Sequence, residues 1–282
     1  MTTHTGPNAD PHQHTDTDTD STTDRTTDGT APARIAIVTG ANRGLGRATA
    51  LRLAADGVDP IITFRSHEDE AAAVVAEARA LGRTAYALRL DTARTAGFAD
   101  FADEVRRLLK EGWGRSDFDY LVNNAGSAVT EPFLEATEEG FDTMLNVHFK
   151  GVYFLTQRLV PLLADGGRIV NLSTGLTRFT SEGLSAYASM KGAVEVFTRY
   201  LAKELGPRGI TANAVAPGPT GTDFGGGFMR DDEGVRAALS GQAALGRVGA
   251  AEDIGGVIAA VLSGGTGWIT GQRIEASGGF LL

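Results

Sequence analysis

Short apolar segments alternate with longer helix-forming segments from residue 34 onward. The apolar segments mostly lack strict polar alternation, as expected for strands that are covered on both faces. They comprise residues 34–39, 60–64, 84–90, 120–123, 168–172, 210–215 and 272–275. The helix-forming segments comprise residues 45–56, 68–81, 96–111, 137–163, 186–205 and 251–262. This order predicts right-handed βαβ crossovers and an α/β fold, a doubly wound parallel sheet flanked by helices in a single domain.

The first 33 residues have a different composition, with runs such as TDTDTDSTTD (15–24). Six aspartates and one arginine place −5 of the net charge of −9 in this segment. A segment with so few apolar side chains has no core to bury, so we predict a disordered Thr/Asp-rich tail over 1–33 and one folded domain over 34–282. His4, His12 and His14 lie among the aspartates, but no fixed geometry selects an ion there, and we predict no metal site.

Composition excludes several classes of function. The net charge of −9 argues against nucleic acid as a partner, because phosphate binding needs a basic face. The chain has no cysteine, which excludes disulfides, thiol nucleophiles and cysteine-ligated metals. No apolar run approaches the roughly 20 residues of a membrane helix, and the N-terminal residues lack the apolar region of a secretory signal. We therefore expect a cytoplasmic protein that binds neither nucleic acid nor membranes.

Three glycines, Gly40, Gly44 and Gly46, follow the first predicted strand and open the first predicted helix, in the sequence TGANRGLG (39–46). Glycines at such a turn let the backbone approach a diphosphate, which then lies on the N-terminal amides of the helix. Tight turns also favour glycine for purely structural reasons. The position between first strand and first helix nevertheless favours dinucleotide binding and a Rossmann-type sheet.

The end of the second strand bears on which dinucleotide binds. Folds that bind NAD commonly carry an acidic residue there for the ribose 2′-hydroxyl. Here the strand ends in TFRS (63–66) and has no acid in that place. Arg65, together with Arg43 in the glycine turn, could bind a 2′-phosphate by charge-assisted hydrogen bonds, although both could also be ordinary surface arginines. We therefore expect NADP(H), with NAD(H) as the weaker alternative.

Tyr187 and Lys191 stand four residues apart in a predicted helix, so their side chains lie on one face. A fixed cation near a phenol favours phenolate and lowers the tyrosine pKa toward the working pH. Tyr187 is therefore a candidate general acid for carbonyl reduction and general base for alcohol oxidation. Taken alone, such a pair could also arise by chance in any helix.

Several further motifs follow one another in a fixed order: LD (90–91), NNAG (123–126), LNVHFKG (145–151), NLST (171–174), APGPTGT (216–222) and ITGQRIEASGG (269–279). With the glycine turn and YASMK (187–191), this order resembles the short-chain dehydrogenase/reductase family, the single-domain type with a Tyr-x-x-x-Lys motif. The resemblance covers residues 34–282. It implies direct hydride transfer between a nicotinamide and a carbonyl or alcohol carbon, without a metal.

The resemblance also implies roles for individual residues. Asp91 would bond the adenine amino group, Lys191 would bond the nicotinamide ribose, and Thr222 would meet the nicotinamide half of the cofactor. Asn146 would hold a kinked helix and a water that supplies protons to Lys191. The full set of predicted cofactor-binding residues is Thr39, Gly40, Asn42, Arg43, Gly44, Leu45, Gly46, Arg65, Ser66, Asp91, Thr92, Asn123, Ala125, Gly126, Tyr187, Lys191, Pro217, Gly218, Thr220 and Thr222.

The hydroxyl that polarises the substrate oxygen has two candidates. The family usually has a serine about thirteen residues before the tyrosine, a position that Thr174 occupies, with Ser173 one residue earlier. Adjacent strand residues point to opposite faces, so the two cannot serve equally. The register favours Thr174, whereas a local loop adjustment would present Ser173.

Three other features suggest surroundings for a substrate. His148 lies two residues after Asn146, and residues so spaced do not share a helix face, so we interpret it as packing or interface. Residues 176–185 and 221–245 are expected to bind the substrate, and the glycines at 225–227 suggest a mobile lid in a long loop, unless that loop is plain surface. Apolar side chains in these segments indicate an apolar substrate: Phe179, Phe224, Phe228 and Met229.

Three functions remain open from sequence. The first is an NADP(H)-dependent oxidoreductase that acts on a carbonyl or secondary alcohol of a small, apolar molecule. The second is a 3-oxoacyl-(acyl carrier protein) reductase, whose acidic partner would require a basic patch; candidates are Arg178, Arg199, Arg208 and Arg230. The third is a non-catalytic dinucleotide-binding sensor. The resemblance further implies a homodimer or homotetramer, with residues 137–163 and 186–205 packing across a two-fold axis.

Overall fold

The computed structural model describes residues 1–3 and 33–282. The predicted disorder of the Thr/Asp-rich tail, and the three tail histidines, fall on residues 4–32 and so lie outside the described residues. Residues 33–282 form one compact unit. Within the described ranges, no helix has the length and apolarity needed to cross a membrane.

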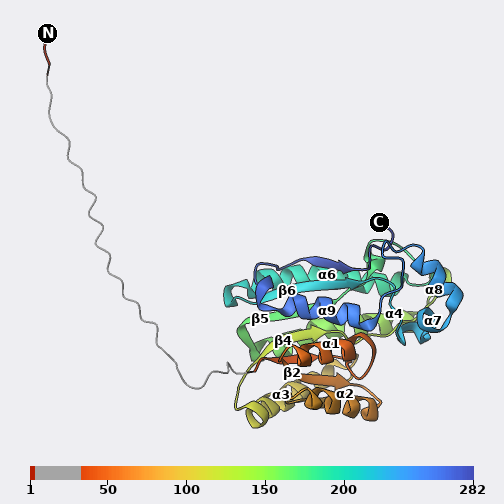
Figure 1. The fold of residues 1–282 in the computed structure, drawn as a ribbon, viewed down its shortest axis with the longest axis horizontal. Coiled ribbons are helices and arrows are strands. Elements are labelled where there is room, and N and C mark those ends of the chain that lie inside the picture. Colours follow the sequence, from red (N-terminus) through yellow and green to blue (C-terminus); the bar gives the residue numbers. More distant parts are fainter. Residues whose placement is uncertain (4–32) are drawn as a thin grey trace. The chain divides into compact units, whose positions relative to one another are not determined.

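The seven strands form one sheet in which every neighbouring pair is parallel. Their order is β3-β2-β1-β4-β5-β6-β7. All seven predicted strands are present, with ends shifted by a few residues. Their bounds are β1 Ile35–Val38, β2 Asp59–Phe64, β3 Tyr86–Arg89, β4 Phe118–Asn123, β5 Leu163–Leu172, β6 Thr211–Pro217 and β7 Arg273–Ala276 (Figure 1). The doubly wound parallel sheet predicted from the sequence is confirmed.

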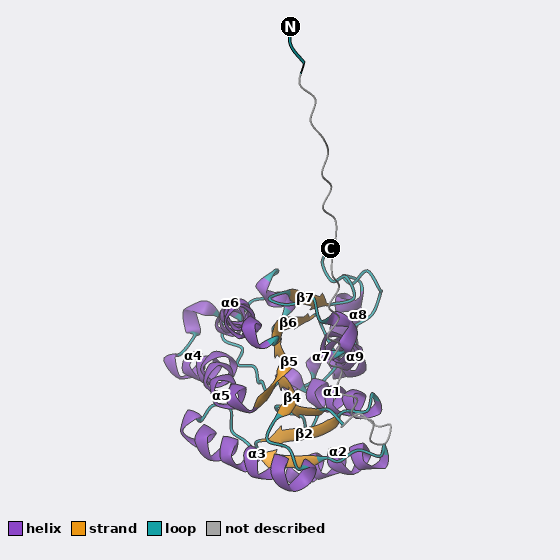
Figure 2. Cartoon of the chain, turned by 90° about the vertical axis from the view of Figure 1, so that its left-hand side faces the viewer, coloured by secondary structure: helices purple, strands orange, loops and turns teal. Residues whose placement is uncertain are grey.

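Helices cover both faces of the sheet (Figure 2). On one face α1, α2 and α9 pack on Ala36 and Val38, and on the other α3, α5 and α6 pack on Ile35 and Ile37. Successive residues of β1 therefore point into two different apolar cores, which explains why this strand lacks polar alternation. The bounds of these helices are α1 Gly44–Ala55, α2 Glu68–Ala80, α3 Phe98–Trp113, α5 Gly151–Leu159, α6 Ser185–Leu205 and α9 Ala251–Leu262.

The single helix predicted over 137–163 is wrong in two respects. The structure divides it into α4 (Glu138–Leu145), a π-helical turn η3 (Asn146–Lys150) and α5, and β5 already begins at Leu163. At Gly151 the helix passes so close to the chain after β3 that a Cβ would lie 2.1 Å from the carbonyl oxygen of Thr92. Pro161 has no backbone N–H and ends the helical segment.

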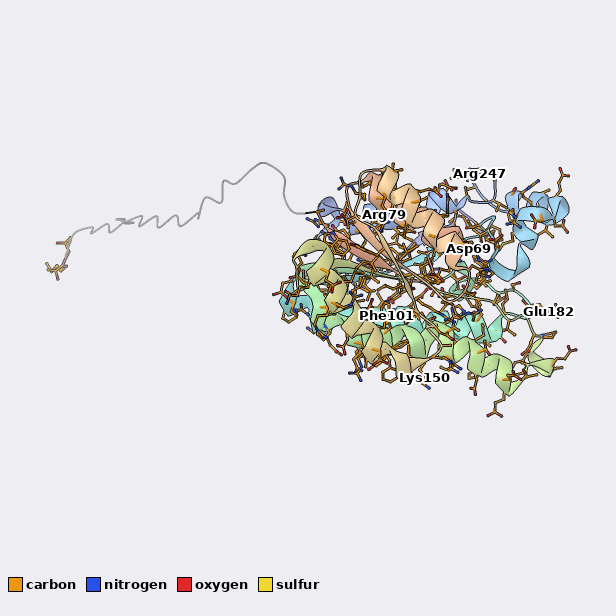
Figure 3. The ribbon with its side chains drawn as sticks, turned by 90° about the horizontal axis from the view of Figure 1, so that it is seen from below. Asp69, Arg79, Phe101, Lys150, Glu182 and Arg247 are labelled. Atoms are coloured by element: carbon orange, nitrogen blue, oxygen red, sulfur yellow. The ribbon has the colours of Figure 1, made fainter. Side chains whose placement is uncertain are left out.

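The long loop predicted within 221–245 is also a correction, because it contains two short helices, α7 (Phe228–Asp231) and α8 (Glu233–Ser240). Asp232 caps α8, and its carboxylate accepts a hydrogen bond of 2.9 Å from the backbone N–H of Val235. The three glycines before α7 all have positive φ, and the first two belong to a short 3-10 turn, η7 (Phe224–Gly226). Glu182, from the loop after β5, lies at the end of the molecule that carries α7 and α8 (Figure 3).

The strand order reverses between β1 and β4, because β2 and β3 are added on one side of β1 and β4 to β7 on the other. At this point the connections after β1 and after β4 lead to opposite sides and leave a crevice at the carboxyl ends of the strands. Ligands of open α/β sheets bind in such a crevice. The fold therefore indicates where a site should lie before any side chain is considered.

Candidate active site

A cavity of about 1000 Å³ opens at the carboxyl ends of the strands. Its walls come from the turns after β1, β2, β3, β4, β5 and β6, from α6, and from the segment with α7 and α8. It brings together the two predicted catalytic side chains of α6 and nearly the whole predicted cofactor set. Four predicted residues do not line it: Thr39, Gly46, Asn123 and Asn146.

The glycine turn has the conformation that the sequence requires. Gly40 and Gly44 have φ of +62° and +57°, and a Cβ on Gly40 would lie 2.8 Å from the Cα of Ala125. Helix α1 begins at Gly44 with no side-chain cap and no acid in its first turn. Its first amides are therefore available to an anionic group in the cavity.

Three of the residues outside the cavity wall hold the turns that form it. The hydroxyl of Thr39 accepts hydrogen bonds of 2.9 Å from the backbone N–H groups of Asn124 and Ala125. Gly46 leaves room for Asn124, whose amide nitrogen would lie 2.5 Å from a Cβ there. The buried Asn123 donates to Thr156 and Asn171, which fixes the end of β4.

One end of the cavity carries two arginines without acidic partners. Arg43, Arg65 and Ser66 line this end, as does His67, which has a φ of +62° at the start of α2. Within the described part of the chain, neither guanidinium forms an ion pair, whereas Asn42 next to them donates to Glu70 at 2.6 Å. Unpaired guanidinium groups at this place fit the additional phosphate of NADP(H).

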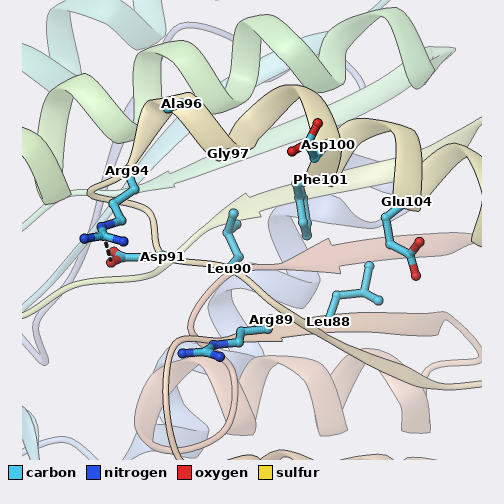
Figure 4. Close-up of a pocket in the computed structure, with 10 residues that line it drawn as sticks. All are labelled: Leu88, Arg89, Leu90, Asp91, Arg94, Ala96, Gly97, Asp100, Phe101 and Glu104. Atoms are coloured by element: carbon cyan, nitrogen blue, oxygen red, sulfur yellow. Dashed lines mark ion pairs between the residues drawn. The ribbon is translucent and has the colours of Figure 1, made fainter.

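Asp91 borders two cavities. One of its carboxylate oxygens accepts from the N–H of Ala93 at 3.0 Å, and the other lies 3.9 Å from Nε of Arg94. Beside the large cavity, it also lines a smaller one of about 560 Å³ between β3 and α3 (Figure 4). Figure 4 shows apolar and charged side chains around this smaller cavity, and none of the predicted catalytic residues lines it.

Tyr187, Lys191 and Thr174 meet at the opposite end of the large cavity. Tyr187 and Lys191 are 7% and 3% exposed on α6, and Nζ of Lys191 lies 5.8 Å from the centre of the Tyr187 ring. The lowered pKa expected for Tyr187 from the sequence is wrong, because burial raises it to about 12, and the hydrogen bond with the Thr174 side chain offsets only part of that rise. Burial lowers the pKa of Lys191 to about 8, and its ammonium donates to the carbonyl oxygen of Leu172 at 2.7 Å. Tyr187 is therefore protonated at neutral pH, the form that can donate a proton.

The adjacent Ser173 points away from this group. Its hydroxyl donates to the carboxylate of Glu195 at 2.5 Å, and the same carboxylate oxygen accepts from Thr177 and from Nε of Arg273, both at 2.8 Å. Ser173 and Thr174 both line the cavity just after the end of β5, but their hydroxyls have different partners. The hydroxyl that bonds Tyr187 is that of Thr174.

Of Asn146 and His148 in the π-helical turn, His148 lines the cavity and Asn146 does not. The His148 ring is fully buried and packs edge-on to Tyr187, with ring centres 4.9 Å apart. Its Nε2 lies 2.6 Å from the carbonyl oxygen of Ser127, and burial lowers its pKa to about 3, so it is neutral. His148 therefore packs as expected, but it packs directly against the phenol of Tyr187. The sequence spacing did not indicate this contact.

The turn after β6 places the last predicted cofactor residues, Pro217, Gly218, Thr220 and Thr222, on the cavity wall. Gly218 permits a close approach to β7, since a Cβ there would lie 2.6 Å from the Cβ of Ser277. The hydroxyl of Thr222 accepts from the N–H of Phe224 at 3.3 Å. This leads the chain from the turn directly into the triple-glycine segment.

Sequence reasoning missed several residues of the wall and its support: Glu195, Arg273, Phe280 and Leu281. The last two line the cavity although they lie at the far end of the sequence. Charged residues inside the predicted α6 and β7 were a signal for the first two, because a helix face or strand that packs against a sheet is normally apolar. No local signal pointed to Phe280.

The family comparison agrees with this arrangement. Residues 40–281 match a family model described as enoyl-(acyl carrier protein) reductase, a model of the short-chain dehydrogenases/reductases. The chain belongs to the short-chain dehydrogenase/reductase family. The resemblance inferred from the motifs is therefore confirmed, and with it the class of oxidoreductases that act on carbonyl and alcohol groups of small molecules.

Three members of the short-chain dehydrogenase/reductase family illustrate the similarity. A hydroxynaphthalene reductase-like protein, Arp2, of Metarhizium brunneum is 34% identical over 87% of this chain and 94% of its own length. A 3-oxoacyl-[acyl-carrier-protein] reductase, FabG, of Staphylococcus epidermidis is 33% identical over 88% of this chain and 98% of its own. The crystal structure of the angucycline C-6 ketoreductase LanV with bound NADP has a TM-score of 0.83 and 38% identity, and covers 88% of this chain and 95% of LanV.

Proposed function

We propose that this protein is an NADP(H)-dependent oxidoreductase that interconverts a carbonyl and a secondary alcohol on a small, apolar molecule. The observation that carries the proposal is the meeting of Tyr187, Lys191 and Thr174 in the cavity that also contains the glycine turn and the two unpaired arginines. Apolar side chains of the cavity wall include Phe179 and Phe224, and the Phe224 ring centre lies 5.6 Å from that of Tyr187. Arp2 is named a hydroxynaphthalene reductase-like protein and LanV an angucycline C-6 ketoreductase, which supports a carbonyl-reducing function.

Residues of α6 and of the turn after β5 would transfer and stabilise the proton. When bound, NADPH supplies the hydride that forms the new C–H bond at the carbonyl carbon. The O–H bond of Tyr187 breaks and its proton moves to the carbonyl oxygen, while the Thr174 hydroxyl donates a hydrogen bond to that oxygen. The Lys191 ammonium stabilises the resulting phenolate, which regains a proton from solvent. In the alcohol direction the same residues act in reverse.

The cofactor preference gives one prediction. Arg65→Ala is expected to raise the Kd for NADPH by about tenfold and to leave the Kd for NADH within about twofold, because only NADPH carries the 2′-phosphate. Fluorescence titration with both cofactors measures this, and Arg43→Ala should behave likewise. Arg52→Ala, which removes an ion pair with Asp56 at the other end of α1, is the control. Equal weakening of both cofactors would contradict the assignment of the 2′-phosphate site.

The choice of polarising hydroxyl gives another. Thr174→Val is expected to lower kcat/KM by about 10²-fold, as losing one oxyanion donor does, whereas Thr174→Ser should stay within about threefold of the wild type. Ser173→Ala removes a hydroxyl that bonds Glu195 instead, so its loss should be below about tenfold. Steady-state ketone reduction with all three variants measures this. A larger loss in Ser173→Ala than in Thr174→Val would reverse the assignment.

The two alternative functions are less well supported. Three of the four arginines proposed for a basic patch pair with acids: Arg178 with Glu275, Arg208 with Asp165, and Arg230 with Asp223 and Asp231. Turnover of NADPH with ketones, diketones, quinones and 3-oxoacyl thioesters, followed at 340 nm, distinguishes the candidates. A strong preference for acyl carrier protein thioesters would favour the second function, and cofactor binding without turnover would favour the sensor.

We further propose a homodimer or homotetramer that works in the cytoplasm. The assembly would use an aromatic surface on α5 and α6, where Tyr153 stacks on Phe197 with ring centres 4.6 Å apart. Tyr153, Phe154 and Tyr200 on this surface are 39%, 40% and 63% exposed. An exposed aromatic patch of this kind is typical of a subunit interface. Multi-angle light scattering measures the mass, and a monomer at micromolar concentration would refute the assembly.

A further inference from the structure

The segment 278–282 forms part of the cavity wall and joins two other parts of it. Gly278 and Gly279 accept hydrogen bonds from the N–H groups of Leu245 and Ala244, at 3.0 and 3.1 Å. Phe280 bridges to Ala243 in the antiparallel sense. The segment is thus paired with the chain that leaves α8, so it connects α7 and α8 to the rest of the fold.

On its other side, the segment meets the loop after β5 through two aromatic rings. Phe280 is 4% exposed, and its ring centre lies 5.0 Å from that of Phe179 at an interplanar angle of 58°. Both residues line the cavity. Gly175 leaves space for Phe179, since a Cβ there would lie 2.6 Å from the Phe179 ring. The pair forms an aromatic wall in the cavity that also contains Tyr187.

Arg178 contacts both residues of this aromatic wall. Its guanidinium binds Glu275 with two hydrogen bonds, of 2.9 and 2.7 Å, and donates to the carbonyl oxygens of Phe280 and Leu281. It also lies 5.5 Å from the centre of the Phe179 ring. The hydrogen bonds of Arg178 therefore reach two segments, β7 and residues 278–282, and its guanidinium also contacts a ring of the loop after β5.

The contacts continue from Arg178 to the reacting end of the cavity. Glu275 also accepts from Arg273 at 3.0 Å, and Arg273 bonds Glu195 and donates to the backbone carbonyl oxygen of Thr174 at 3.2 Å. Hydrogen bonds from Arg178, Ser277 and Arg273 lower the pKa of the Glu275 carboxyl to about 2. Glu275 is therefore ionised at all working pH values. A connected group of charged side chains thus links the aromatic wall to Thr174, the residue beside Tyr187.

We propose that Phe280 and Phe179 are the specificity-determining residues, receiving a flat aromatic ring of the ketone, and that Arg178 is the positioning residue that holds them. This inference rests on the proposed function, since it names the substrate class for the same site. Aromatic rings prefer tilted or offset contacts with one another, which two tilted rings in a wall can offer to a third. An aliphatic ketone gains less from such a wall.

The test compares 1-tetralone, a bicyclic aromatic ketone, with cyclohexanone in the full-length enzyme. Phe280→Ala is expected to raise KM for 1-tetralone by about tenfold while KM for cyclohexanone changes by less than about twofold and kcat for both by less than about threefold. Phe280→Tyr should restore most of the selectivity. Arg178→Met should lose selectivity by about threefold without altering the Kd for NADPH.

Arg107→Met is the matched control, because Arg107 binds Glu104 and Glu111 on the exposed side of α3, away from the cavity. Equal changes for both ketones, or none in any variant, would overturn the inference while leaving the proposed function intact. If the wild type reduces neither ketone, the proposed function fails for this class. Calorimetric binding of 1-tetralone in the presence of NADP⁺ then still decides the inference: loss of binding in Phe280→Ala supports the wall, and unchanged or absent wild-type binding refutes it.

Discussion

Tyr187→Phe is expected to lower kcat for ketone reduction by about 10³-fold, within the range that a positioned general acid contributes. The phenol lies almost wholly buried against His148 and Phe224, and the substitution keeps the ring that makes these contacts. Only the hydroxyl and its hydrogen bond with Thr174 are removed. The loss should therefore fall on the chemical step, with the Kd for NADPH within about twofold of the wild type.

Single-turnover reduction separates this loss from product release, and fluorescence titration gives the Kd. Tyr86→Phe is the matched control, because Tyr86 lies on β3 and packs against Trp113 of α3, away from the large cavity. That control should keep full activity. A Tyr187→Phe enzyme with more than a tenth of wild-type kcat would show that another group supplies the proton, and the neutral, buried His148 beside the ring would be examined next.

Lys191→Met is expected to lower kcat by about 10²-fold or more and yet leave the protein at least as stable as the wild type at pH 7. Burial lowers the Lys191 pKa from 10.5 to about 8, which corresponds to a penalty of about 3 kcal/mol for holding the ammonium in the folded state. The variant loses one hydrogen bond to the Leu172 carbonyl, worth about 1 kcal/mol. The burial penalty exceeds the lost hydrogen bond, so the difference in the free energy of unfolding favours the variant.

The pH dependence checks the same reasoning. Because the folded-state pKa of Lys191 lies below its unfolded value, the unfolded chain binds more protons between about pH 8 and 10.5, and wild-type stability should gain from this group as pH rises through that window. The variant should lack this gain. Wild-type reduction should fall above about pH 8 as the ammonium loses its proton, and Lys191→Met should show no such limb.

Chemical denaturation at pH 7 and pH 9.5, and pH profiles of kcat/KM, measure the two effects. Lys203→Met is a suitable control, because Lys203 lies in the last turn of α6 near its exposed end. A marked loss of stability in Lys191→Met at pH 7 would mean that the ammonium stabilises the fold, contrary to the pKa argument. Unchanged activity would remove Lys191 from the proposed mechanism.

The sequence by itself determined the fold and most of the site. Seven apolar segments, most of them without polar alternation, were sufficient to predict a covered parallel sheet, because strands that are covered on both faces need apolar side chains on both. The glycine turn then indicated a diphosphate-binding turn between the first strand and the first helix. The spacing of Tyr187 and Lys191 indicated a catalytic pair on one face of a later helix. Both signals are local: a positive φ demands glycine, and a helix brings residues four apart to one face.

Only the tertiary structure decided what depended on contacts between distant segments. At Asn146, where the family resemblance implied a kink, it divided the predicted helix into two helices and a π-helical turn, with Gly151 close to the Thr92 carbonyl, and it placed His148 rather than Asn146 on the cavity wall. It also directed Ser173 to Glu195 and left Thr174 beside Tyr187. Phe280 became part of the cavity through Arg178, about a hundred residues earlier in the chain. No local pattern encodes such pairings, because they arise from the packing of the whole sheet with its helices.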